Sequence, residues 1–304
     1  MTITRTTVGK LAVDDFAVDS SSLYNQTALP STGGMTRFVI ANDILTMNDV
    51  VGIRNDTGAF VGCVSADISN DSQADGANSA GVVWSIDETV PSKALQNLYF
   101  LRQNGGYWQL YSFLNGSATL LTSSPPGLSG LGTWGKVRLY RDGATLHGRA
   151  GGTDLSAVDL TSADATHSPA YGGLRYSSGS RLAHGDNLWL STSHIVVFSG
   201  LEPGYYLLAA DSLSGQKKVQ ESGGTATLDA GALWFPLVSI GVYDGDPDGG
   251  GSLVEAVTSA TYSDMGGGDT YIYSTGGGPT PPGMLIPQIV VPQYYPQFGG
   301  LTYG

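Results

Sequence analysis

The chain has 304 residues, a formal net charge of −12, and only 14 Lys and Arg against 26 Asp and Glu. This acidic balance repels phosphate backbones and argues against nucleic acid as a partner. No apolar run approaches the roughly 18 residues that a membrane helix needs, so we expect no membrane partner. With 44 Gly and only 13% charged residues, the composition favours short strands joined by glycine turns over long surface helices.

Residues 1–12, MTITRTTVGKLA, are predicted to form an N-terminal segment that precedes the first domain. They contain no run of apolar residues of the kind found at the centre of a signal peptide. We therefore expect synthesis in a cytoplasm without a signal peptide.

Residues 13–193 alternate period-2 apolar segments with Gly, Asn, Asp and Ser turns, which is typical of antiparallel strands in a sandwich or barrel. Hairpin turns are indicated at Asn104-Gly105-Gly106, Asn115-Gly116 and Asp142-Gly143. The predicted strands cover residues 36–41, 60–68, 81–86, 98–103, 107–114, 136–141, 145–150 and 187–191. Cys63 lies within such a strand, and we interpret it as a small buried hydrophobic residue rather than a reactive thiol.

The order of these segments resembles the laminin-G or concanavalin-like jelly roll over about residues 10–197. The resemblance is carried by AGVVWSID, by the hairpin WGKVRLYRDGATLHGRAGGTDL and by the closing strand GGLRYSSGSRLAHGDNLWLS. In that family the closing strand lies beside an N-terminal Asp-Asp-Phe, here Asp14-Asp15-Phe16. The resemblance implies an antiparallel jelly-roll sandwich and specifies fold better than function.

Residues 194–274 are predicted to form a second, smaller β-sandwich, joined to the first domain at the polar junction Thr192-Ser193-His194. This unit opens on GLEPG, carries GGTATLD at its centre and closes on GGDTY. With these motifs it resembles small β-sandwiches of bacteriophage and bacterial surface proteins. We expect the two domains to be separable.

Residues 275–304 carry no charge and combine a Gly/Pro-rich linker with an apolar, proline-punctuated end. Proline at this density predicts an extended chain, and such an apolar segment is poorly suited to remain free in water. A mobile end is the alternative, but we expect a docking arm that binds other subunits or a second copy of the chain. Its apolar residues are Ile286, Ile289, Val290, Val291, Tyr294, Tyr295 and Phe298.

An acidic stretch in the second domain matches the calcium-loop formula of an EF-hand, with Asp244, Asp246, Asp248 and Glu255 at the ligand positions. The flanking segments are β-branched and apolar, however, so the helices of an EF-hand are missing, and Pro247 interrupts the loop. We therefore predict an acidic turn and no cofactor. A bound calcium ion is the alternative.

Catalytic signatures are absent from the sequence, and we predict that the protein is not an enzyme. The Glu-x-Asp-x-x-Glu strand of the laminarinase-like glycosidases does not occur, and the only glutamates are Glu88, Glu202, Glu221 and Glu255. No Gly-x-Ser-x-Gly elbow and no phosphate-binding Gly-Lys-Ser/Thr loop is found either.

Aromatic side chains in the first domain suggest a sugar-stacking platform, for which the candidates are Tyr107, Trp108 and Trp134, with Trp84 and Tyr111 nearby. In strands, alternate aromatics usually point into the core, so we expect most of them to be buried.

Two functional hypotheses follow. The first is a structural protein on the capsid or tail surface of a tailed bacteriophage virion, anchored to other virion subunits or to itself by the C-terminal arm. The second is a carbohydrate-binding adhesin or receptor-binding tail component that uses the jelly roll to bind a host-surface glycan.

Overall fold

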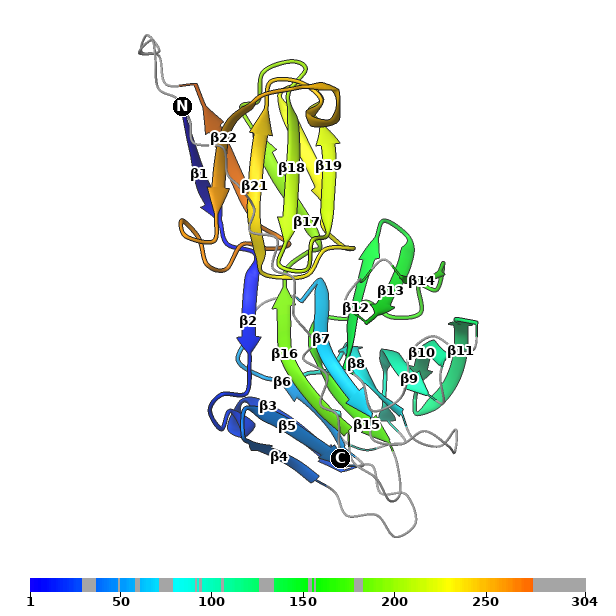
Figure 1. Ribbon diagram of the computed structural model, residues 1–304. Coiled ribbons are helices and arrows are strands. Elements are labelled where there is room, and N and C mark those ends of the chain that lie inside the picture. Colours follow the sequence, from blue (N-terminus) through cyan, green and yellow to red (C-terminus); the bar gives the residue numbers. More distant parts are fainter. Residues whose placement is uncertain are drawn as a thin grey trace, which may run out of the picture.

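The protein is built almost entirely from β-strands that form two bodies stacked end to end (Figure 1). The computed structural model describes residues 1–28, 37–48, 50–57, 61–70, 79–90, 92, 95–104, 107–125, 134–152, 155, 157–177 and 183–275. Within these ranges no helix is long and apolar enough to cross a membrane. The all-β prediction is confirmed.

The larger body is a sandwich of two antiparallel sheets. The seven-stranded sheet has the order β11-β10-β9-β8-β15-β6-β3, and the eight-stranded sheet the order β14-β13-β12-β7-β16-β5-β4, with β2 also paired to β16. The chain passes repeatedly from one sheet to the other, as in a jelly roll. The strands of the first sheet are β3 (Tyr24–Ala28), β6 (Val50–Arg54), β8 (Ser79–Ser85), β9 (Leu98–Asn104), β10 (Tyr107–Leu114), β11 (Ser117–Ser123) and β15 (Tyr171–Ser177). Those of the second are β2 (Lys10–Asp14), β4 (Arg37–Ala41), β5 (Ile44–Asn48), β7 (Cys63–Asn70), β12 (Gly135–Asp142), β13 (Thr145–Gly151), β14 (Val158–Ser162) and β16 (Ala183–Ser191).

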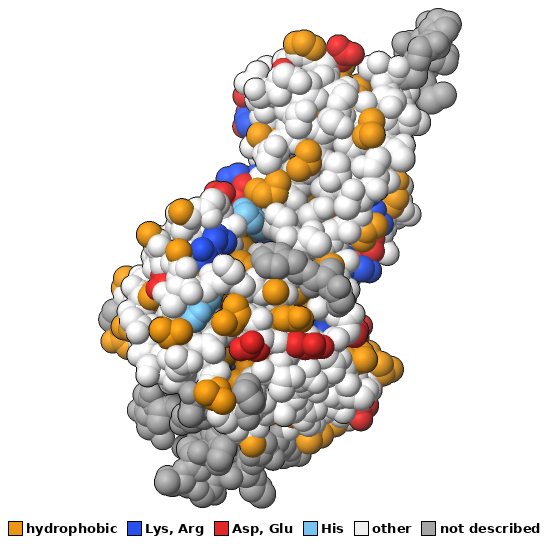
Figure 2. Space-filling view, turned by 180° about the vertical axis from the view of Figure 1, so that it is seen from behind, with side chains coloured by type: hydrophobic (Ala, Val, Ile, Leu, Met, Phe, Trp, Pro, Cys, Tyr) orange, Lys and Arg blue, Asp and Glu red, His pale blue; other side chains and the backbone are white. Residues whose placement is uncertain are grey.

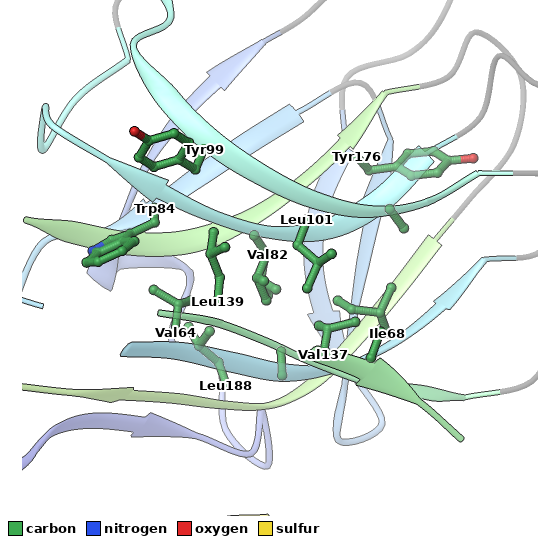
Figure 3. Close-up of a cluster of buried hydrophobic side chains, with 14 of the residues drawn as sticks. Val64, Ile68, Val82, Trp84, Tyr99, Leu101, Val137, Leu139, Tyr176 and Leu188 are labelled. Carbon is green, nitrogen blue, oxygen red and sulfur yellow. The ribbon is translucent and has the colours of Figure 1, made fainter. Parts of the chain in front are cut away.

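The core of the large domain fills the space between these sheets. Val82 and Leu101 of the seven-stranded sheet point toward Val137 and Leu139 of the eight-stranded sheet, and all four are fully buried (Figure 3). Because side chains alternate along a strand, alternate residues of the strands contribute to this layer, and in β16 the alternation changes phase at a bulge between Asp186 and Trp189. Burying a side chain of this size stabilises the fold by roughly 1.5–3 kcal/mol.

Two of the predicted hairpin turns fix the register of their strands. Asn115 and Gly116 both have positive φ, at 48° and 77°, as a two-residue turn between β10 and β11 requires. Between β12 and β13 the turn residues are Gly143 and Ala144, because Asp142 pairs with Thr145 and only Gly143 has positive φ. The turn predicted at Asp142-Gly143 is therefore displaced by one residue.

The smaller body is a second sandwich, of two four-stranded sheets with the orders β1-β23-β17-β20 and β19-β18-β21-β22. Its core contains Phe198, Leu207, Leu228, Ile240 and Tyr271. The strands of the first sheet are β1 (Thr2–Thr7), β17 (Ile195–Ser199), β20 (Thr225–Asp229) and β23 (Thr270–Ser274). Those of the second are β18 (Tyr206–Asp211), β19 (Gln216–Gln220), β21 (Leu237–Tyr243) and β22 (Leu253–Thr258).

The N-terminal segment expected over residues 1–12 divides between the two domains. Strand β1 pairs with β23 of the small domain, and β2 pairs with β16 of the large one. Between them Gly9 donates from its backbone nitrogen to Asp269 over 2.8 Å. A Cβ atom at Gly9 would lie only 2.3 Å from the Gly268 backbone, so a side chain does not fit at this crossing. Arg5 adds an ion pair with Asp264 at 2.8 Å.

The junction between the domains is apolar and closely packed. Cys63, Tyr140 and Trp189 of the large domain belong to the same buried cluster as the core of the small one. The ring centroids of Trp189 and Phe235 lie 5.7 Å apart. Burial raises the pKa of the Cys63 thiol, which fits the structural role expected for it. The chain thus passes from one domain to the other at residues 192–194, beside a core that the two domains share. A shared core does not favour the expectation that the domains can be separated.

His194 makes the stability of this junction sensitive to acid. Its ring centroid lies 4.1 Å from that of Tyr140 and its Nε2 lies 3.9 Å from Asp229. Burial, opposed by Asp229 and Asp142 and assisted by Arg138, lowers the pKa of His194 to about 4. The unfolded chain binds a proton near pH 6.5, so this contribution to stability is fully present above pH 6.5 and is lost progressively as the pH falls toward 4.

We therefore expect His194→Phe to flatten the pH dependence of unfolding between pH 6.5 and 4, where the wild type loses up to about 3 kcal/mol through this group. Urea unfolding at half-unit pH steps measures the difference. If the free energy of unfolding falls with pH at the same slope in the variant and the wild type, His194 does not control the pH dependence.

Candidate functional site

The face of the seven-stranded sheet that points away from the core, called here the outer face, carries the most distinctive groups of the large domain. It is apolar at one end, where Val83, Phe100 and Phe113 form a small buried cluster with Val90. The segment that carries Val90 is tied to β3, because the Thr27 hydroxyl donates to the carbonyl of Val90. This end of the outer face is therefore covered by the chain itself.

Next to this apolar end, a row of polar side chains runs across four neighbouring strands. Arg175 of β15 pairs with Gly81 of β8, Gly81 pairs with Arg102 of β9, and Arg102 pairs with Gln109 of β10. Paired residues of antiparallel strands point to the same side of a sheet, so the three side chains share one face. Each strand adds about 4.8 Å across the sheet, so the two arginines start about 10 Å apart.

Arg102 is held by a network of neutral acceptors. Its Nε and Nη2 donate to the Gln109 amide oxygen over 3.1 and 2.9 Å, and Nη2 also donates to the Tyr111 hydroxyl over 2.9 Å. The guanidinium lies 4.2 Å from the centroid of the Tyr111 ring. Nη1 contacts the Ser79 hydroxyl at 3.3 Å. These contacts orient the guanidinium but leave its charge uncompensated.

Arg175 is more deeply buried, with 3% of its surface exposed. Its guanidinium lies 4.3 Å from the ring centroid of Phe113 and 4.8 Å from that of Phe100. Within the part of the chain that the structure describes, Nε and Nη1 have no hydrogen-bond partner. Burial, reinforced by the charge of Arg102, lowers the pKa of Arg175 to about 9, so the group remains protonated at neutral pH.

The predicted aromatic platform is not assembled as one surface. Trp108 is fully buried in the core between the sheets, so its proposed role in sugar stacking was wrong. Tyr107, the preceding residue, points the other way and lies exposed on the outer face. Trp134 is also exposed, but it precedes β12 of the opposite sheet. Alternation along the strand separates these rings.

Lys218 of β19 contacts the acidic loop of the small domain, the stretch for which a bound calcium ion was the alternative. Lys218 Nζ lies 2.5 Å from carboxylate oxygens of both Asp246 and Asp248. Asp244 accepts a bond from the backbone nitrogen of Ser252 instead, over 2.6 Å. Glu255 lies on β22, and among the described residues no three acidic, His or Cys side chains gather as a metal site would require. The hydrogen bond from Lys218 lowers the pKa of Asp246.

A serine and a histidine meet in the large domain, but inside it. Ser112 Oγ lies 3.2 Å from His167 Nε2, and both residues are buried. Burial also lowers the pKa of His167.

The docking arm predicted at Ile286, Ile289, Val290, Val291, Tyr294, Tyr295 and Phe298 lies outside the described residues.

The arginine row was missed by the sequence analysis. A signal was present, because Arg102 and Arg175 each follow uncharged, largely apolar residues within their strands, in a chain with few basic residues. Only the pairing of β15, β8 and β9 places them side by side.

No protein-family model and no curated protein matches the chain. Solved structures of similar arrangement include a β-glucanase from Bacillus licheniformis, 8% identical over 61% of this chain and 99% of that one, with a TM-score of 0.45. The carbohydrate-binding module CBM66 from Bacillus subtilis is 10% identical over 55% of this chain and 94% of its own, with a TM-score of 0.37. The CBM2 module of an evolved Dit protein of Lactobacillus casei BL23 phage J-1 is 12% identical over 60% and 94%, with a TM-score of 0.41.

These likenesses concern the arrangement of strands. The large domain is an antiparallel jelly-roll β-sandwich, as the sequence analysis expected.

Proposed function

We propose that this protein is a non-enzymatic binding protein whose large domain takes carbohydrate on the outer face of the seven-stranded sheet. The observation that carries the proposal is the combination on one face of guanidinium, amide and phenol groups at Arg102, Gln109, Tyr111 and Tyr107. Sugar hydroxyls need fixed donors and acceptors, and sugar rings stack on aromatic faces. This row offers both within a few strand spacings.

The composition of this face also supports binding rather than hydrolysis. None of the residues that the described strands β3, β6, β8, β9, β10 and β15 place on the outer face is Asp or Glu. Glycosidases use two carboxyl groups on either side of the bond that they cleave.

The experiment is a glycan array probed with the whole chain, followed by calorimetry on the best ligand. We expect Gln109→Ala and Tyr107→Ala to weaken binding at least tenfold, because each removes a group that faces the ligand. Trp134→Ala is the matched control, since this exposed aromatic belongs to the other sheet and its loss should leave affinity unchanged. Absence of specific binding, or loss of binding in the Trp134 variant alone, would refute the proposal.

We further propose that the chain is a structural component of a tailed-bacteriophage virion, exposed on the capsid or tail surface and joined to other subunits or to itself through residues 284–304. This proposal is supported by the motifs of the small domain and by the uncharged, apolar C-terminal sequence. The two roles are compatible, because a surface subunit with a sugar-binding domain would act as an adhesin. Deletion of residues 279–304, followed by a measurement of particle assembly, tests this proposal.

A further inference from the structure

We propose that residues 284–304 of one copy of the chain dock on the small domain of a second copy, against the outer face of the sheet β19-β18-β21-β22. This surface is called here the tyrosine face and is defined by Tyr206, Leu208, Tyr243 and Leu253. The inference rests on the docking arm of the proposed function and names the surface that receives it.

The first argument is what the strand register places on this face. Tyr206 pairs with Tyr243, and Tyr243 with Leu253, so the three side chains form one row across β18, β21 and β22. In the next row Leu208 pairs with Gly241, where a Cβ atom would lie 2.9 Å from a ring carbon of Tyr243. The adjacent residues of β18 and β21 are buried in the core of the small domain, whereas the four residues of the tyrosine face are only half-buried. The sheet therefore presents aromatic and aliphatic groups to solvent.

The second argument is charge. Among the described residues of these four strands, the tyrosine face carries no Asp or Glu. Lys218 lies beside Leu208 in the same sheet, but its Nζ is compensated by Asp246 and Asp248, each at 2.5 Å. Residues 284–304 carry no charged side chain either. Contact between the two would therefore bury apolar surface without removing an uncompensated charge from water.

The third argument is the chemistry of the arm. Proline-rich segments bind to surfaces lined by aromatic side chains, because an extended chain stiffened by prolines loses little entropy on docking. The arm contains Pro287, Pro292 and Pro296 among its apolar residues. Tyr206 and Tyr243, paired on neighbouring strands, supply aromatic rings for such a segment.

The fourth argument is the place where the chain leaves the small domain. Strand β23 ends at Ser274, and the ring centroid of Tyr273 lies 5.9 Å from that of Tyr205, the residue before β18. The arm thus starts at the end of the sandwich that carries Tyr206, and this end points away from the large domain (Figure 1). The linker at residues 275–283 can span at most about 30 Å. Its prolines favour an extended course, which favours delivery to a neighbouring copy over folding back.

The opposite outer face of the small domain is a poorer match. Strands β1, β23, β17 and β20 place mainly Thr and Ser there, with Ile272 as an exposed apolar residue. Figure 2 views the molecule from behind, and in its upper part the small domain is largely white, with hydrophobic side chains in scattered groups. An apolar arm would bury less apolar surface there.

Sedimentation velocity of the full chain measures the self-association that this docking produces. We expect Leu208→Glu to raise the dissociation constant at least tenfold, because the arm would have to cover a carboxylate. The new group lies opposite Lys218, so the melting temperature should stay unchanged. Ile272→Glu is the matched control, since it makes a similar change on a central strand of the other sheet and should leave self-association unchanged.

Cross-linking locates the contact independently of stability. Tyr294 is replaced by the photoreactive residue benzoylphenylalanine in the full chain, and isotope-labelled and unlabelled copies are mixed before irradiation. We expect mass spectrometry to find cross-links to peptides that contain Tyr206 or Tyr243, joining a labelled copy to an unlabelled one.

The outcomes separate this inference from the docking arm itself. Cross-links to another surface or within one copy, or equal self-association of Leu208→Glu and wild type, overturn the tyrosine face of a second copy as the partner and leave the arm in place. A chain that stays monomeric overturns it as well, and another virion subunit is then the partner. Self-association that survives deletion of residues 279–304 refutes the docking arm. If Leu208→Glu lowers the melting temperature, the cross-links decide.

Discussion

Arg138→Ala is expected to lower the free energy of unfolding by about 3 kcal/mol, because it removes a buried side chain that forms hydrogen bonds across the junction of the two domains. Arg138 of β12 is fully buried and its Nη1 donates to the carbonyl of Ala230 over 2.9 Å and to that of Leu233. Its guanidinium lies 3.9 Å from the ring centroid of Phe235. The substitution removes the donor to the Leu233 carbonyl and leaves a cavity between the domains, while the Ala230 carbonyl still accepts from the Leu233 backbone nitrogen over 3.0 Å.

Chemical unfolding monitored by circular dichroism measures this loss. Arg138→Met is the informative companion, since it refills the cavity but restores no hydrogen bond and should recover part of the stability. Arg149→Ala is the control, because Arg149 pairs with Arg138 across the hairpin but its described partners all lie in the large domain: the Tyr140 hydroxyl at 3.3 Å and Asp159, in a partly exposed ion pair at 3.1 Å. Such a pair contributes about 0–1 kcal/mol. Similar losses in the Arg138 and Arg149 alanine variants would rule out a special role for the junction.

Deletion of residues 279–304 is expected to abolish incorporation into the particle or self-association, while circular dichroism and melting stay unchanged. Ile286, Ile289, Val290, Val291, Tyr294, Tyr295 and Phe298 would together remove several hundred Å² of apolar surface from water on docking. At about 25 cal/mol per Å², the free energy gained by this burial outweighs the entropic cost of ordering a chain that prolines already stiffen. Sedimentation and particle assembly measure the effect.

The double substitution of Tyr294 and Tyr295 with Ser refines this test, because it keeps the length and the prolines of the segment. A folded variant that no longer assembles supports a docking arm. Normal assembly of that variant contradicts it, and loss of folding in the deletion would mean that the segment belongs to a β-domain.

Much of the local structure of the large domain could be predicted from the sequence. Each of the eight strands predicted in the large domain overlaps an observed strand, because period-2 alternation and glycine turns are local properties of the chain. Asn115-Gly116 could be placed as a turn because only a few residue types adopt positive φ at low energy. Strands such as β11 (Ser117–Ser123), which is largely exposed and polar at both ends, gave no such signal.

The contacts between distant residues could not be predicted in this way and are known from the folded chain. It placed the N-terminal strand β1 beside β23 in the small domain, Arg138 against the loop at residues 230–233, and Trp108 in the core with Tyr107 outside it. It also aligned Arg175 with Arg102 through Gly81. The physical reason is that strand order and register depend on pairings between segments many residues apart, and a shift of one residue turns every side chain of a strand to the opposite face.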